Sequence, residues 1–176
     1  KIFLLNIKLN KNFEVDDFEK IKIKTYKNET KNNDFLIQKS KKIVISGEIF
    51  DAQPLLKTLY KTSDKKTFSK NFTSKIKVNL DRTLTGTGDS VSDIGIIASI
   101  SKGSYDKLSL KGNFSENEIV EMSIYQIDKD KKTLQLFSDR ARPFVKYFNF
   151  IKGFEGGKLE YESTISKKVT NSNLTI

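Results

Sequence analysis

The feature that most constrains the fold is a series of short segments in which apolar and polar residues alternate. Within residues 18–26, 76–80, 94–101 and 108–114, apolar and polar side chains alternate over most positions, with Lys, Ser, Asn or Gly between most of the apolar ones. A period of two is typical of strands with one buried and one wet face. Because short polar turns separate these segments, the sequence predicts a mainly β fold, a curved antiparallel sheet that forms a groove-like meander.

Two segments interrupt the alternation and predict short amphipathic helices. Each contains one of the two prolines of the chain, and proline suits the first helical turn, where its missing N–H costs little. In the first segment we expect Asp51 to cap the helix and Pro54 to lie in its first turn, ahead of an apolar face made by Leu55, Leu56 and Leu59.

The second helix is expected at Pro143, after a cap supplied by Asp139 or Ser138. A cap explains Asp139 better than a catalytic role does, because a helix start follows it directly. Glycines at 156 and 157 are expected to turn the chain into a strand over residues 159–165. The helix face predicted to pack on the sheet consists of Phe144, Val145, Phe148 and Ile151.

Composition excludes several classes of chemistry. The chain has no Cys and no His, so it lacks a thiol nucleophile, an imidazole base and a zinc site of the usual type. We therefore expect a protein that is not an enzyme and that holds neither a metal nor a cofactor. The net charge of +10 comes mainly from lysines at alternate strand positions, which favours a solvated sheet face over a nucleic-acid interface.

The predicted sheet has more apolar surface than two short helices can cover. One explanation is an ordinary core, in which a second layer covers the apolar face. The more specific alternative is that part of this face contacts another apolar partner, such as lipid. Ile97 and Met122 do not fit the simple alternation, so the sequence leaves open which face lines the groove. The residues predicted to face lipid are Ile94, Ile96, Ile100, Leu108, Leu110 and Phe114.

One motif resembles a known family. The run Ser138-Asp139-x-Ala141, an amphipathic segment and Gly156-Gly157-Lys158-Leu159 resemble the S-D-D-A-G-x-L-L-R … G-G-x-L signature of AsmA-like C-terminal domains. These domains occur in Gram-negative envelope proteins related to AsmA and TamB. The resemblance covers about residues 47–165, including the run from Asp51 to Leu56. The chain departs from the family at Arg140 and Arg142, where the second Asp and the Gly would stand.

The resemblance implies a non-enzymatic segment of a larger β-groove protein, with residues 1–176 forming one piece of it. Such a groove would bind or conduct phospholipid, or another acyl-chain lipid, between the inner and outer membranes. It would lie on the periplasmic side of the inner membrane, attached through an anchor outside this segment. The alternative is a scaffold or adhesin-like β domain of the envelope without a lipid ligand, and no nucleic-acid partner is expected.

Overall fold

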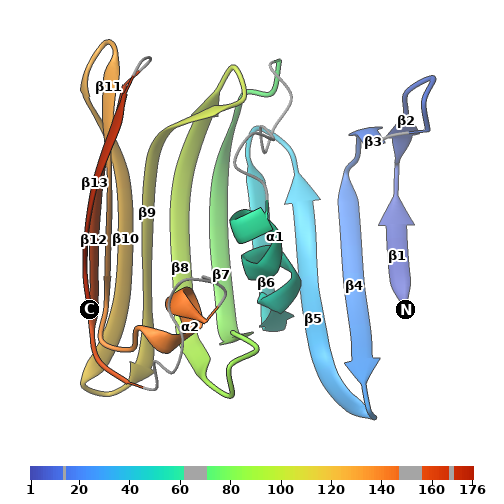
Figure 1. The fold of residues 1–176 in the computed structure, drawn as a ribbon. Helices are drawn as coiled ribbons and strands as arrows, with labels where there is room; N and C mark the ends of the chain where they lie inside the picture. The colour runs from blue at the N-terminus through green and yellow to red at the C-terminus, as the bar shows by residue number, and fades with distance from the viewer. Residues whose placement is uncertain (14, 62–70, 147–155, 167–168) are drawn as a thin grey trace.

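One open β-sheet dominates the structure. The computed structural model describes residues 1–13, 15–61, 71–146, 156–166 and 169–176. Within these residues, eleven strands form a single sheet in the order β1-β4-β5-β6-β7-β8-β9-β10-β11-β12-β13, and β2 pairs with β3 separately. The two ends of the chain lie at opposite edges of the sheet (Figure 1). The strands are β1 (Ile2–Leu5), β2 (Lys8–Leu9), β3 (Val15–Asp17), β4 (Lys20–Lys27), β5 (Thr30–Lys39), β6 (Ile43–Asp51), β7 (Ser74–Leu84), β8 (Ser90–Ser101), β9 (Ser104–Ser115), β10 (Glu118–Asp128), β11 (Lys131–Ser138), β12 (Leu159–Ser166) and β13 (Thr170–Thr175), and the helices are α1 (Gln53–Lys61) and α2 (Arg142–Val145).

The mainly β fold class is confirmed, with one departure in strand direction. Among the described strands of the large sheet, neighbours are antiparallel, with one exception: β6 and β7 run parallel to each other. The connection between them contains α1, and a crossover of this kind is what a parallel pair requires. The prediction of antiparallel pairing is therefore wrong for β6 and β7. The connection that contains α1 brings the chain back to the end of the sheet where β6 begins, so β7 runs in the same direction as β6.

Tight turns set the register of two hairpins. Asn28 and Glu29 both have positive φ between the paired residues Lys27 and Thr30, as a two-residue hairpin of the primed type requires. Lys102 and Gly103 do the same between β8 and β9. The turn between β4 and β5 therefore has only two residues, 28 and 29, and the polar residues that follow belong to β5.

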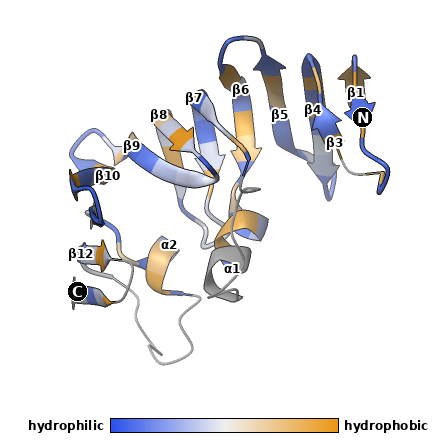
Figure 2. Ribbon diagram, turned by 90° about the horizontal axis from the view of Figure 1, so that it is seen from above, coloured by the Kyte–Doolittle hydropathy of each residue, from blue (hydrophilic) through white to orange (hydrophobic). Residues whose placement is uncertain are grey.

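The sheet is curved, and both helices lie on its concave side (Figure 2). The α1 segment begins as expected, since the Asp51 carboxylate accepts a hydrogen bond from the Gln53 N–H at 3.1 Å. Pro54 is the second helical residue. The first turn of α1 therefore combines a side-chain acceptor with a residue that needs no N–H partner.

The expected cap of α2 is wrong. The residue before α2 is Ala141, and no side chain caps the helix. Pro143 is the second helical residue and is buried. Asp139 instead accepts a hydrogen bond from the Ile119 N–H at 2.9 Å, so its carboxylate binds the backbone near the start of β10. Phe148 and Ile151, expected on the packing face of this helix, lie outside the described residues.

The close approach of β5 and β6 requires a glycine at position 47. A Cβ added to Gly47 would lie 2.4 Å from the Asp34 carbonyl oxygen and 2.5 Å from the Phe35 Cα. Both contacts are with backbone, which cannot move without shifting the pair of strands. A Cβ added to Gly95 on β8 would meet no heavy atom within 4 Å.

We predict that Gly47→Ala lowers the free energy of unfolding by about 1–3 kcal/mol, because the methyl group overpacks a backbone contact. Urea denaturation of the purified chain measures this directly. Gly95→Ala is the matched control and should change stability by less than about 0.5 kcal/mol, as open surface sites do. Equal effects of the two substitutions would show that β5 and β6 do not approach each other as described.

Candidate functional site

A continuous row of apolar side chains crosses the whole sheet. Residues that pair directly across neighbouring strands point to the same face, so the register assigns each strand one member of this row. Every one of the eleven strands of the large sheet contributes an aliphatic, Met or Tyr side chain. This apolar row consists of Leu4, Ile21, Ile37, Ile45, Val78, Ile96, Leu110, Met122, Leu136, Tyr161 and Leu174.

Two flanking rows widen the row into a stripe on the same face. With a strand spacing of about 4.8 Å, ten steps between eleven strands give a path of about 48 Å across the sheet. We call the three rows together the apolar stripe. One flanking row contains Ile23, Phe35, Gly47, Leu80, Ile94, Gly112, Val120, Ser138 and Leu159, and the other contains Ile43, Ile76, Ala98, Leu108, Ile124, Leu134 and Ser163.

Burial varies along the stripe. Its centre is packed, with Val78 7% exposed in a core cluster that also includes Leu80 and Val120. Half-buried apolar side chains from β4 to β11 pack around that cluster without being enclosed by it. At the two sheet edges the row is open, since Leu4 is 54% exposed and Leu174 is 41% exposed. The stripe is therefore a core at its middle and an accessible apolar surface around and beyond it.

The six residues predicted to face lipid all point to the concave face, but they differ in accessibility. Ile94, Ile100 and Leu108 are buried, at 7%, 2% and 8% exposure, and serve as packed core. Ile96, Leu110 and Phe114 are half-buried and lie against the core cluster. Of the six residues, only Ile96, Leu110 and Phe114 therefore present accessible apolar surface.

Helix α2 covers the stripe at one end. Val145 is 1% exposed and packs with Ala141 and Leu159 in a second core cluster. Phe144 packs against both clusters. Glycines 156 and 157 precede β12, and the Gly157 carbonyl accepts a hydrogen bond from the Ala141 N–H at 2.9 Å. These contacts seat α2 on the concave face beside β11 and β12.

Sequence reasoning missed much of the apolar row. Leu136 alternates with Gln135 and Leu134, and that alternation was the available signal for it. Ile37 and Ile45 lie in the continuous apolar runs 35–37 and 43–45, where the sequence does not mark the inward face. Met122 lies opposite Leu110 and is therefore a member of the row. Ile97, the other residue that breaks the alternation, lies on the opposite face and is 67% exposed. Cross-strand partners therefore decide which face carries the apolar row.

Arg140, for which the sequence predicted no role, links three segments at the end of the sheet that carries α2. Arg140 donates hydrogen bonds to Glu118 at 3.1 Å and to Asp89 at 2.7 Å, and its guanidinium lies 5.4 Å from the Phe114 ring centre. These contacts join the turn before β8, the turn before β10 and the entry to α2. Arg140 occupies one of the two positions where the chain departs from the family signature.

Ion pairing sets the protonation of this cluster. The hydrogen bond from Arg140, and that from Ser115, lower the pKa of Glu118. The Ile119 N–H and the ion pair with Lys158 at 2.8 Å lower the pKa of Asp139. A small hollow of about 280 Å³ is lined by these groups. Within the described part of the chain no group of three His, Cys, Asp or Glu side chains is arranged to hold a metal ion. We call the contacts of Arg140 with Glu118 and Asp89 the Arg140 clamp.

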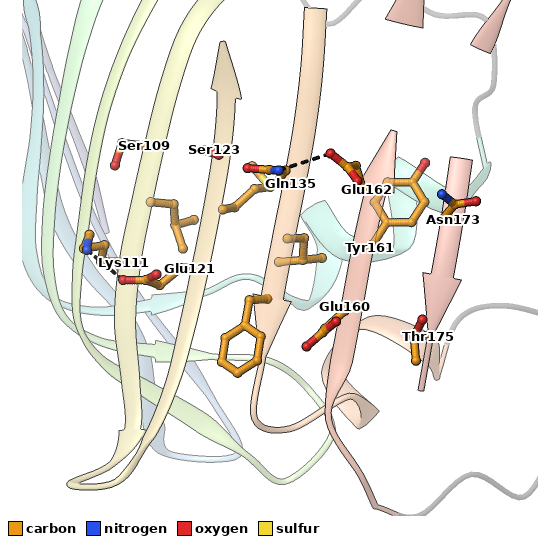
Figure 3. A pocket seen from close by; sticks show the side chains of 14 residues that line it. Ser109, Lys111, Glu121, Ser123, Gln135, Glu160, Tyr161, Glu162, Asn173 and Thr175 are labelled. Carbon is orange, nitrogen blue, oxygen red and sulfur yellow. Dashed lines mark hydrogen bonds and ion pairs between the residues drawn. The ribbon is translucent and has the colours of Figure 1, made fainter. Parts of the chain in front are cut away.

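A second hollow, of about 450 Å³, lies over β9 to β13 on the opposite, polar face. Its polar side chains pair with one another, as Figure 3 shows: Lys111 with Glu121 at 2.7 Å, and Gln135 with Glu162 at 3.1 Å. The rows of these residues alternate with the apolar row along each strand. This is the arrangement of a solvated sheet surface.

Comparisons with models of known families, with curated proteins and with solved structures find no match for this chain. Among the described residues, no helix combines the length and the apolar character needed to cross a membrane. The support for a function therefore comes from the two faces of the sheet and from the sequence motif.

We predict that the Arg140 clamp makes stability depend on acidity. The folded pKa of Glu118 lies below its ordinary value of about 4.3, so its contribution is present above that pH and is lost as the pH falls through the lowered value. Arg140→Gln should reduce this loss, because the neutral side chain no longer favours the ionised carboxylate. Thermal unfolding midpoints measured from about pH 7 to about pH 2 test the prediction.

Arg82→Gln is the matched control, since Arg82 is exposed on β7 and removal of its charge leaves the clamp intact. Its pH dependence should follow that of the original chain. An identical acid-induced decrease in Arg140→Gln and Arg82→Gln would contradict the clamp.

Proposed function

We propose that the concave face of the sheet binds the acyl chains of phospholipid, as a non-enzymatic segment of a hydrophobic β-groove. The observation that carries this proposal is the apolar row, which has a member in each of the eleven strands of the large sheet. A core needs apolar residues only where two layers meet. A row that extends to both exposed edges instead offers a continuous path for an extended apolar ligand.

The coverage of the concave face supports the same function. In the described ranges, only α1 and α2 lie on this side of the sheet (Figure 2). Ile96, Leu110 and Leu136 on this face remain half-buried. Each methylene of an acyl chain that reaches such a surface contributes about 0.8 kcal/mol, so ten buried methylenes would contribute about 8 kcal/mol before ordering costs. Affinity then needs no polar contact, and headgroup selectivity is weak.

The sequence motif supplies the cellular setting of the proposal. The resemblance of residues 47–165 to AsmA-like domains implies a groove on the periplasmic side of the inner membrane that carries phospholipid toward the outer membrane, and we propose this setting for the chain. The same resemblance implies a membrane anchor outside this segment. An open sheet with one apolar and one polar face is compatible with that setting.

A second candidate is an envelope scaffold with no lipid ligand. The observation that favours it is the burial of Ile94, Ile100 and Leu108, which shows that part of the stripe is satisfied by the chain itself. A scaffold needs no accessible apolar surface. The half-buried members of the row distinguish the two candidates, because only lipid binding uses the apolar surface that they leave accessible.

We predict that Ile96→Asp weakens uptake of a short-chain fluorescent phospholipid by about tenfold or more, because a charge is placed on the acyl path. Uptake is titrated in solution at lipid concentrations too low to form vesicles, and mass spectrometry identifies lipid that co-purifies. Circular dichroism checks that the variant is folded.

Ile97→Asp makes the same chemical change one residue along the strand on the opposite face, and it should bind the phospholipid like the original chain. No uptake by the original chain after removal of co-purified lipid would favour the scaffold. Equal losses in the two variants would place the binding surface elsewhere.

A further inference from the structure

A large and exposed apolar side chain, Ile97, stands in the middle of the polar face. It is 67% exposed and sits on β8, directly beside the groove residue Ile96 in the sequence but on the other face. Gly95, its neighbour on the same face, leaves open space where a side chain would stand. Neither the groove nor the core uses Ile97.

Lysines surround Ile97. Lys77 on β7 lies directly opposite it, and Ser109 on β9 lies on its other side. The register places Lys75, Lys107 and Lys111 at three of the four diagonal positions, which are close enough for long side chains to reach across. The fourth diagonal position is Asn79. All four lysines are exposed.

Little negative charge offsets this group. Lys111 pairs with Glu121 at 2.7 Å, both groups being well exposed. Among the described residues, Lys75, Lys77 and Lys107 form no ion pair. The patch formed by Ile97 and the four lysines is therefore positive around an apolar centre. We call it the Ile97 patch.

We infer that the Ile97 patch docks the convex face of the sheet on an anionic lipid surface. Lysines near such a surface are attracted to acidic headgroups, and their aliphatic stems can lie along the interface while the ammonium groups stay in water. Ile97 would then enter the headgroup region. Charge complementarity alone would also suit a nucleic acid, but no aromatic residue stands among the neighbours of Ile97 to stack on bases.

This inference does not depend on lipid binding in the groove. The patch and the apolar row lie on opposite faces of the same strands, so a chain that binds no lipid in the groove can still dock. The arrangement would hold the polar face against a membrane while the concave face remains open.

Vesicle flotation with the 176-residue chain tests the inference. Vesicles of phosphatidylcholine alone are compared with vesicles containing about one-third phosphatidylglycerol, and we expect binding only to the anionic vesicles, weakened by added salt. The triple variant Lys75→Gln, Lys77→Gln, Lys107→Gln should bind roughly a hundredfold more weakly, at about fivefold for each lysine. Ile97→Ser should bind about tenfold more weakly.

The matched control is Lys27→Gln, Lys41→Gln, Lys129→Gln, which removes the same charge from exposed positions outside the patch. It should stay within about threefold of the original chain, since it leaves the local charge around Ile97 unchanged. Ile96→Asp should also dock normally when circular dichroism shows it folded.

Three results would overturn the inference: equal binding to neutral vesicles, equal losses in the two triple variants, or full binding by Ile97→Ser. Binding of single-stranded DNA that falls with the patch lysines but not with Ile97→Ser would assign the patch to nucleic acid instead.

Discussion

The structure depends on strand register. In a pleated sheet the side chains alternate between faces, so a slip of one residue in any pair would move that strand's apolar residues to the wet face. The pairing keeps one apolar residue in line on each strand, from Leu4 on β1 to Leu174 on β13. The alignment survives the irregular pairing in β5–β6 and in β8–β9, where Asp93 has positive φ. The continuous stripe is the product of that alignment.

The same alternation gives the sheet two surfaces with different chemistry. Ile96 and Ile97 are consecutive, yet one belongs to the concave apolar row and the other stands among lysines on the convex side. The helices contribute to only one of these surfaces, where α2 and the Arg140 clamp close one end of the stripe. A groove on one face and an interfacial surface on the other would let a single layer of strands contact lipid in two ways.

Much of this was predictable from the sequence, and the failures have physical causes. Period-two patterning predicts the strands because it reflects burial on one face. The prolines help to predict where the helices begin because, within a helix, proline fits best in the first turn. The parallel pair β6–β7 was missed because pattern gives no strand direction. Asp139 was misread as a cap because its partner, the Ile119 N–H, is twenty residues away in sequence. The Arg140 clamp likewise joins segments that only the fold brings together.

The most direct test of the lipid-groove proposal is photo-crosslinking from single positions on β11. A photoreactive phenylalanine analogue at Leu136 would lie in the apolar row, while the same analogue at Gln135 would face the polar side. The proposal predicts a phospholipid adduct, detected by mass spectrometry of the intact protein, at Leu136 and none at Gln135 with monomeric lipid in solution. Absence of an adduct at Leu136, or equal adducts at both positions, would contradict it.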